Sequence, residues 1–272
     1  MNTYEKLTAV TEFLKPYYNG ATIGIVLGSG LGDFVKEIKV EREVSYEEVP
    51  HFPVSTVQGH KGKLIFGTIG DKPVMAMAGR FHFYEGYSAE EVVFPIRVMK
   101  FLGVQTLFLS NAAGGVNTSF KVGDLMIIRD HISFATKNPL IGKNDERFGP
   151  RFPDMSEPYK KELIQKAKDL AKTLNIDLKE GVYFCVTGPT FETHAEYKLV
   201  HVLGGDAVGM STVQEVIVAR HMNMDVFAMS VITDIGIREE DNIITHEEVL
   251  QAAKEAEPKF AAILKGLIAS LD

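Results

Sequence analysis

Residues 22–34 read TIGIVLGSGLGDF, an apolar run that ends abruptly in glycines. Ile23 to Leu27 have the length and composition of a short buried strand. Ser29 and its flanking glycines predict a tight turn at the end of this strand. A second apolar run, TLFLSNAAGG at 106–115, leads into small residues in the same way. In α/β folds, ligands collect where strands end in loops, so both strand ends are candidate parts of a site.

Helix-start patterns alternate with these strands along the chain. A Ser or Thr followed three residues later by Glu or Gln predicts a capping box, and the pairs are Ser88 with Glu91, Thr193 with Glu196, Ser211 with Gln214, and Thr245 with Glu248. Gly103 predicts a helix end, Pro258 a kink or an end, and Gly70-Asp71 a hairpin turn. The alternation predicts one α/β domain over residues 1–272, with a mixed, largely parallel central β-sheet flanked by helices.

Composition excludes several classes of protein. The 272 residues carry a formal charge of −7 with no basic stripe, which argues against a nucleic-acid partner. No apolar run approaches the ~20 residues of a membrane span. The first residues lack a signal-peptide apolar block, so a cytoplasmic protein is expected. Cys185, the single cysteine, lies in an apolar segment and predicts an inert buried thiol.

The common nucleotide, hydrolase and metal motifs are absent from the sequence. GSGLGD carries Asp33 where a dinucleotide fingerprint needs its last glycine. Neither Ser29 nor Ser211 fits G-x-S-x-G, and HEEVL at 246–250 is not H-E-x-x-H. No metal site is expected. These exclusions leave open an enzyme that needs neither metal nor cofactor.

Residues 79–87, GRFHFYEGY, concentrate polar side chains in a short segment. On an extended backbone, Arg80, His82 and Tyr84 would fall on one face. Such a face suits an anion, because Arg can hold phosphate with two hydrogen bonds. A solvated surface strand explains the alternation about equally well.

Other candidate residues have both a functional and a plain structural interpretation. Ser29 and Ser211 fit an anion site at a turn and at a helix start, or an ordinary turn and cap. Ala112 and Ala113 would let a ligand approach the backbone closely, but a tight turn explains these small residues nearly as well. Phe191 and Glu192 suit a base, through stacking and hydrogen bonds, but a Glu stabilised by the dipole of the following helix is the competing explanation. Asp234 ends an apolar strand, where a carboxyl group must cap a turn or meet a ligand, and His246 also fits a solvated first helical turn.

Taken together, the segments GSGLG, GHKGKL, GRFHFYEGY, NAAGGVN, GDLMIIRDHI, NDERFGPRFP, GPTFET and AVGMSTVQEVIVARH resemble the trimeric purine nucleoside phosphorylases, in the same order over nearly the whole chain. The resemblance implies the nucleoside phosphorylase fold, a homotrimer and a pentosyltransferase. The implied reaction is reversible phosphorolysis of (deoxy)inosine or (deoxy)guanosine for purine salvage. No cofactor is implied, and inorganic phosphate is the co-substrate.

The resemblance also implies a role for individual residues. The implied phosphate ligands are Ser29, His60, Arg80, His82, Ala112 and Ser211. The implied ribose neighbours are Tyr84, Met210, His246 and, from a neighbouring subunit, Phe148. The implied base-binding residues are Phe191, Glu192, Asp234, Tyr183 and Val208. Catalytic roles fall to His82, Glu192, Asp234 and His246.

Asp234 departs from the family, whose members usually carry asparagine there. An ionised aspartate only accepts hydrogen bonds and favours a 6-aminopurine, whereas Glu192 as a carboxylate favours the N1–H of a 6-oxopurine. We therefore expect a 6-oxopurine enzyme that keeps Asp234 protonated in the complex or that tolerates adenosine. A methylthioadenosine or adenosine phosphorylase of the same fold and a non-catalytic nucleoside-binding protein are the alternatives. His246 argues against the former, which normally has a smaller residue there.

Overall fold

Strand β1 (Ile23–Leu27) is buried at every position and lies inside the sheet, as its apolar sequence predicts. The computed structural model describes residues 1–57, 61–237 and 244–271. The other strands are β2 (Lys39–Ser45), β3 (Lys63–Ile69), β4 (Lys72–Ala78), β5 (Thr106–Gly115), β6 (Leu125–Ile132), β7 (Leu178–Cys185), β8 (Ala207–Gly209) and β9 (Asp225–Ile235). The α-helices are α1 (Thr3–Leu14), α2 (Ala89–Leu102), α3 (Lys161–Thr173), α4 (His194–Val202), α5 (Val213–His221) and α6 (His246–Ala269).

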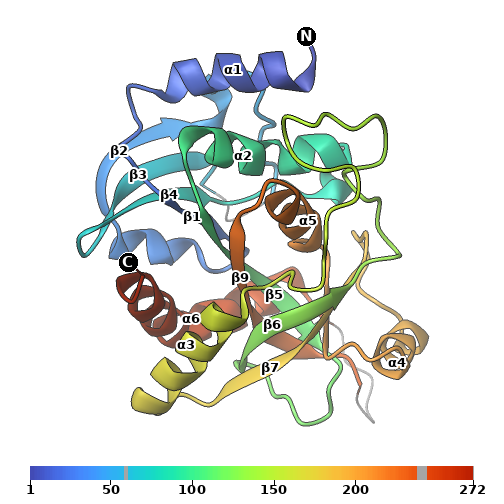
Figure 1. Cartoon of the computed structure of the whole chain (residues 1–272). Helices are drawn as coiled ribbons and strands as arrows, with labels where there is room; N and C mark the ends of the chain where they lie inside the picture. Colours follow the sequence, from blue (N-terminus) through green and yellow to red (C-terminus); the bar gives the residue numbers. More distant parts are fainter. Residues whose placement is uncertain (58–60, 238–243, 272) are drawn as a thin grey trace.

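The strands form one mixed sheet in the order β2-β3-β4-β1-β5-β8-β7-β6-β9. β9 also pairs in parallel with β5, so β5, β8, β7, β6 and β9 close into a ring, and β1 to β4 extend from β5 as an open arm (Figure 1). The expected α/β domain with a mixed sheet flanked by helices is confirmed. Because helices cover the sheet, β1 is buried throughout, and β4 and β9 are buried over most of their length.

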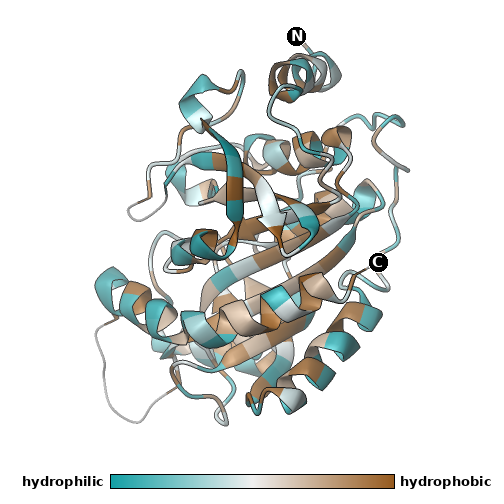
Figure 2. Cartoon of the chain, turned by 90° about the vertical axis from the view of Figure 1, so that its left-hand side faces the viewer, coloured by the Kyte–Doolittle hydropathy of each residue, from teal (hydrophilic) through white to brown (hydrophobic). Residues whose placement is uncertain are grey.

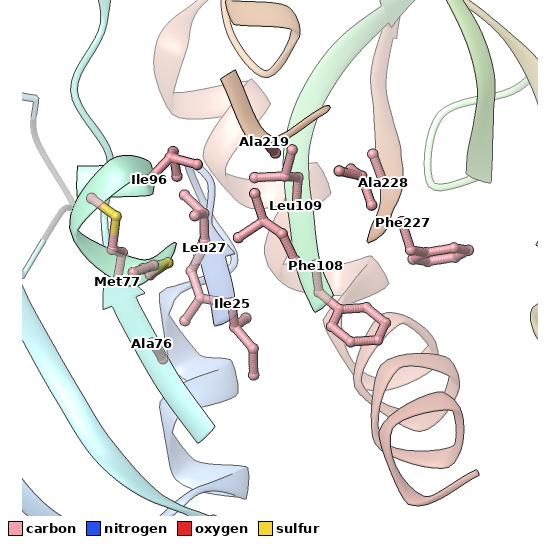
Figure 3. Close-up of a cluster of buried hydrophobic side chains, with 14 of the residues drawn as sticks. Ile25, Leu27, Ala76, Met77, Ile96, Phe108, Leu109, Ala219, Phe227 and Ala228 are labelled. Carbon is pink, nitrogen blue, oxygen red and sulfur yellow. The ribbon is translucent and has the colours of Figure 1, made fainter. Parts of the chain in front are cut away.

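The core lies between the parallel strands and the helices that cover them. Figure 3 shows aliphatic and aromatic side chains from neighbouring strands meeting those of α2 and α5. The labelled residues are Ile25 and Leu27 of β1, Ala76 and Met77 of β4, Ile96 of α2, Phe108 and Leu109 of β5, Ala219 of α5, and Phe227 and Ala228 of β9. Figure 2 shows hydrophobic residues along the central strands, while the peripheral helices alternate hydrophilic and hydrophobic residues.

Local sequence signals set most element boundaries. Capping boxes form at Ser88, Thr193 and Thr245, and α2 ends at Gly103, which has a positive φ of 121°. The hairpin between β3 and β4 turns at the predicted Gly70-Asp71. Pro258 does not end α6, which continues to Ala269. In the described ranges, no helix is long and apolar enough to cross a membrane.

The turn after β1 is shaped by its contact with α6. Gly30 has a φ of 75°, a conformation that side chains disfavour. A Cβ built on Gly30 would also lie 2.4 Å from the Cβ of Ala253 in α6. Glycine is therefore required here for two reasons, and the close approach places Ser29 at the end of β1 beside α6.

Candidate active site

The C-terminal ends of β1, β5 and β9 and the segment after β4 surround one cavity, as expected for an α/β sheet. Its lining residues are Ser29, Arg80, His82, Tyr84, Asn111, Ala112, Ala113, Gly114, Phe191, Glu192, Val208, Gly209, Met210, Ser211, Thr233, Asp234, His246 and Val249. Most of the sequence-predicted site residues are therefore brought together. The exceptions are Tyr183 and Phe148, which do not line this cavity, and His60, which lies outside the described residues.

The segment that carries Arg80, His82 and Tyr84 is not a strand through its full length. β4 ends at Ala78, and residues Phe83–Glu85 form a short 3₁₀-helix. The predicted alternation on an extended backbone is therefore wrong for Tyr84. The three side chains still line the cavity together, because the 3₁₀ turn brings the Tyr84 ring against His82, with centroids 4.7 Å apart and planes 15° apart.

Arg80 is held in the cavity wall by a carboxylate that the sequence analysis did not identify. Its guanidinium is 1% exposed and makes two hydrogen bonds to Glu215 of α5, at 3.2 Å from Nε and 2.8 Å from Nη2. It also donates to the carbonyl oxygen of Ser110. A buried guanidinium fixed by two-point contact presents its remaining edge in a defined direction. Glu215 is thus a positioning residue for Arg80.

His82 is oriented in the same way by Glu85. The ring Nδ1 lies 2.9 Å from Oε1 of Glu85, which also accepts the backbone N–H of His82 at 2.8 Å. Burial lowers the pKa of His82, so the ring is neutral at pH 7. Burial raises the pKa of Glu85, but hydrogen bonds from His82 and Thr56 outweigh it and bring that pKa to about 2. With Nδ1–H donated to a carboxylate, Nε2 of His82 is left as the acceptor.

Ser211 does not cap α5 as predicted. The helix begins at Val213 after Thr212, whose φ of 73° turns the backbone sharply, and no side-chain cap forms there among the described residues. The hydroxyl of Ser211 lies 3.3 Å from that of Thr212, which accepts a hydrogen bond from Asn111 at 2.9 Å. The turn directs Ser211 into the cavity wall, which a spacing rule for capping boxes cannot reveal.

Two carboxyl groups and a phenyl ring also line the cavity. Glu192 and Phe191 precede α4, and Asp234 lies near the end of β9. A Cβ at Gly114 would lie 2.8 Å from Oδ2 of Asp234, so only glycine leaves room for this carboxyl. Burial raises the pKa of Glu192, and nearby Asp234 raises it further. A raised pKa makes the protonated form of Glu192 more accessible, so its ionisation can respond to the ligand.

Tyr183 lies behind the cavity rather than in its wall. The side chain is fully buried, and its hydroxyl accepts a long hydrogen bond of 3.4 Å from the backbone N–H of Ser211. A Cβ at Gly209 would lie 2.3 Å from this hydroxyl. Tyr183 therefore packs against the floor formed by Gly209 and Ser211, and it supports the predicted base slot without lining it.

Phe148, which is expected to reach a neighbouring subunit, packs inside its own chain. It is 8% exposed, and its ring packs against Tyr4 and Phe101, with the guanidinium of Arg97 4.8 Å from its centre. Moving it into another subunit would empty this cluster. Four residues later, Phe152 is 86% exposed. The sequence places two phenylalanines in NDERFGPRFP, and only burial distinguishes them.

Several residues that support the site carry no motif. Glu85 and Glu215 hold His82 and Arg80, and Tyr197 lies beside Glu192 and Asp234. Glu215 is an acidic residue inside an apolar helical segment, EVIVA, and that signal alone pointed to a buried partner. Tyr197 reads as part of the apolar face of α4, so the sequence gives no indication of its neighbours.

Known proteins resemble this chain in sequence and in fold. Residues 22–269 match the family model described as the phosphorylase superfamily. The chain is 52% identical over 250 residues to purine nucleoside phosphorylase 1 of Bacillus subtilis (strain 168), covering 92% of each, and 46% identical over 277 residues to the purine nucleoside phosphorylase of Rattus norvegicus, covering 99% of this chain and 96% of the relative. The Schistosoma mansoni purine nucleoside phosphorylase in complex with adenosine matches with a TM-score of 0.93 at 40% identity over 98% of both chains. Its isoform 2, in complex with cytosine and ribose-1-phosphate, matches with a TM-score of 0.94 at 42% identity over 99% of this chain and 97% of that one. The chain therefore belongs to the phosphorylase superfamily and, within it, to the purine nucleoside phosphorylases.

Proposed function

We propose that this enzyme catalyses the reversible phosphorolysis of (deoxy)inosine and (deoxy)guanosine to free purine and (deoxy)ribose 1-phosphate. The observation that carries the proposal is that one cavity is lined by both hydrogen-bond donors and carboxyl groups. Arg80 donates to the carbonyl oxygen of Ser110, whereas Asp234 lies against Gly114, four residues further along β5. Hydrogen-bond donors suit phosphate, and carboxyl groups suit the N1–H and N7 edge of a purine.

Phosphate is the nucleophile in this proposal. Arg80 and the hydroxyls of Ser29 and Ser211 hold it, together with the backbone at Ala112, and the neutral His82 accepts a proton from it or donates one back. As phosphate approaches C1′, the bond from C1′ to N9 breaks, and its electron pair passes into the purine. The sugar then has oxocarbenium character, which the neighbouring phosphate charge stabilises. Tyr84, Met210 and His246 surround the ribose and fix its orientation.

The base end must stabilise the departing purine. Phe191 stacks on the ring beside Val208, and Glu192 accepts the N1–H of a 6-oxopurine. A protonated Asp234 donates to the O6 and N7 edge, where negative charge develops. Protonation at N7 makes the purine a neutral leaving group, so the reaction needs no further acid.

Asp234 supports a second candidate activity. As a carboxylate it accepts from the 6-amino group of adenosine, so an adenosine or methylthioadenosine phosphorylase fits this one residue. His246 lines the same cavity and narrows the space near the ribose, which disfavours a bulky thioether there. A nucleoside-binding protein without turnover is the remaining alternative, and it does not account for donors gathered beyond the sugar position.

The first experiment follows base release from inosine, guanosine, adenosine and methylthioadenosine, each with and without phosphate. We expect phosphate-dependent release of hypoxanthine and guanine, and slower release of adenine. Release from methylthioadenosine above that from inosine would favour the second candidate. Nucleoside binding without any release would make the protein a receptor and overturn the proposed reaction.

We also propose a homotrimer in which the exposed Phe152, in place of Phe148, closes a neighbour's ribose site. Phe152 and Ile141 line a surface hollow, and both are mostly exposed, at 86% and 63%. Exposed apolar side chains gathered in this way are typical of an interface. Sedimentation velocity at micromolar concentration tests the assembly, and a monomer would contradict it.

We further propose that the enzyme uses no cofactor and works in the cytoplasm. Phosphate supplies the nucleophile, and side chains supply the proton chemistry, so no step calls for a metal. Dialysis against EDTA should leave the rate of inosine phosphorolysis unchanged, and a loss restored by added Mg²⁺ or Zn²⁺ would contradict this. The single free thiol of Cys185, whose pKa burial raises to about 12, suits a reducing compartment.

A further inference from the structure

Tyr197 of α4 is fixed in one position beside the base end of the cavity. It is 4% exposed and packs with Val116, Phe184 and Val208. A Cβ at Gly236 would lie 2.1 Å from a carbon of its ring, so the chain after β9 lies flat against the phenol. The ring therefore cannot turn away without disturbing both α4 and the segment after β9.

The hydroxyl of Tyr197 is buried but makes no hydrogen bond of normal geometry in the part of the chain that the structure describes. Burial raises its pKa, and the carboxyl groups of Asp234 and Glu192 raise it further because both lie near it. A buried hydroxyl without a hydrogen bond is unfavourable. Small movements of either carboxyl group on ligand binding would complete a hydrogen bond to it.

Three ionisable groups thus meet at the base end. Glu192 faces Asp234 of β9, Tyr197 and Glu196 of α4, and its own backbone N–H, and His246 of α6 lines the same cavity. Two carboxyl groups that lie near each other titrate as a coupled pair, because the charge of one opposes the ionisation of the other. A phenol O–H donates to one acceptor at a time, and it stabilises whichever carboxyl group is ionised. The Tyr197 hydroxyl lowers the pKa of Glu192, whereas burial and Asp234 raise it.

We propose that Tyr197 is a positioning residue that holds Glu192 as the carboxylate and leaves the shared proton on Asp234, so that the site selects 6-oxopurines over 6-aminopurines. This inference rests on the proposed function and adds the residue that decides between its two base classes. With the proton on Asp234, Glu192 accepts N1–H and Asp234 donates to the O6 and N7 edge. Adenine presents an acceptor at N1 to the Glu192 carboxylate and a donor at its 6-amino group to the protonated Asp234. Both contacts are therefore mismatched.

Tyr197→Phe tests the proposal, because it removes the hydroxyl and keeps the ring. We expect kcat/KM for inosine at pH 7 to fall about tenfold, while the value for adenosine stays level or rises. The acidic limb of the pH profile for inosine should move to higher pH, because Glu192 loses the hydroxyl that lowers its pKa. Tyr18→Phe is the matched control, since Tyr18 bonds the Ala21 carbonyl at 3.2 Å far from the cavity.

A double variant separates positioning from packing. In a Glu192→Gln background, Tyr197→Phe should change the ratio of inosine to adenosine activity by less than twofold, because Tyr197 acts through Glu192. Equal losses for both nucleosides with an unmoved pH profile would show a structural role only and overturn the proposal.

Calorimetric binding of hypoxanthine and adenine gives a readout that needs no turnover. Weaker hypoxanthine binding by Tyr197→Phe with unchanged adenine binding supports the proposal even if wild type fails to release base from inosine. Failure of wild type to turn over would count against the proposed function alone. Unchanged affinities for both bases would overturn the role of Tyr197 alone.

Discussion

At the scale of single residues, Asp234 gives the sharpest test of base preference, because Asp234→Asn changes only one group of the side chain. An aspartate can give up its proton and an asparagine cannot, so wild type should accept a 6-amino group better than Asp234→Asn does. We expect Asp234→Asn to lower kcat/KM for adenosine relative to inosine by about tenfold, the cost of one mismatched hydrogen bond of roughly 1.4 kcal/mol. Parallel assays with the two nucleosides measure it. Equal rejection of adenosine by both proteins would exclude adenosine tolerance.

The low pKa of Glu85 predicts that its contribution to stability depends on pH. Its pKa in the folded protein is about 2, below the roughly 4.3 of an unfolded chain, so its contribution to stability is present above pH 4.3. That contribution is lost as pH falls towards 2. Glu85→Gln should therefore melt below wild type at pH 7, and the two melting temperatures should converge as pH falls to about 2. A gap that is the same at both pH values would show that the charge of Glu85 does not matter.

The sequence can predict which residues gather at the cavity where local patterns mark them. Phe191, Glu192, Ser29 and Arg80 stand beside strand ends or helix starts, and all four line the cavity. Tyr183 lies behind the cavity and Phe148 in a separate aromatic cluster, which the sequence cannot show because burial depends on which distant residues surround a ring. Tyr197 was not identified for the same reason, since its two carboxyl neighbours come from other segments of the chain.

At the scale of elements, α5 supports the part of the cavity wall that contains Arg80. Arg80 follows β4 and Glu215 lies in α5, both nearly inaccessible to water. Removing one member of a buried ion pair leaves the other charge without compensation, at a typical cost of 3–5 kcal/mol.

Glu215→Gln keeps the shape of the side chain and removes its charge, so it should lower stability by about 3 kcal/mol. It should also raise KM for phosphate, because the guanidinium of Arg80 loses its fixed direction. Denaturant unfolding and phosphate titration measure the two effects. Lys265→Gln is the control, because it breaks the partly exposed pair with Glu37 and should change neither quantity appreciably.

Helix starts illustrate what local patterns can and cannot predict. The boxes at Ser88, Thr193 and Thr245 form because side chain and backbone lie within one turn of each other. Ser211 has the same spacing to Gln214 but forms no capping box. The helix starts after Thr212, whose positive φ turns the backbone and moves Ser211 away from the helix start. The alternating residues 80–85 suggest an extended strand, but Phe83–Glu85 form a 3₁₀ turn that ends at Gly86. Alternation alone does not distinguish the two.

At the scale of the whole molecule, the two phenylalanines of residues 144–153 should behave oppositely. Phe148→Ala empties a buried aromatic cluster and should cost about 3–5 kcal/mol of folding stability. Phe152→Ala removes an exposed ring and should leave the unfolding of the subunit unchanged while weakening assembly or raising KM for nucleoside. Thermal melts, sedimentation and kinetics on both variants decide the matter. Normal kinetics and assembly for Phe152→Ala would return the intersubunit role to another residue.

The fold class could be predicted from the sequence, but the closure of β5 to β9 into a ring could not. Alternating strands and capped helices indicate an α/β domain. The parallel pairing of β5 with β9 joins segments more than a hundred residues apart through backbone hydrogen bonds, which leave no signature in side-chain periodicity.

That ring has a consequence for how the protein is made. On the ribosome, the arm of β1 to β4 and the first strand of the ring, β5, emerge early, but β9 at Asp225–Ile235 emerges among the last segments. Until then β5 presents an unpaired edge of apolar residues, and β6 lacks its antiparallel neighbour. Asp234 arrives with β9, so the strand that closes the ring also delivers a residue of the proposed base pocket. A nascent chain stopped before residue 225 can therefore neither bury its core nor complete the cavity.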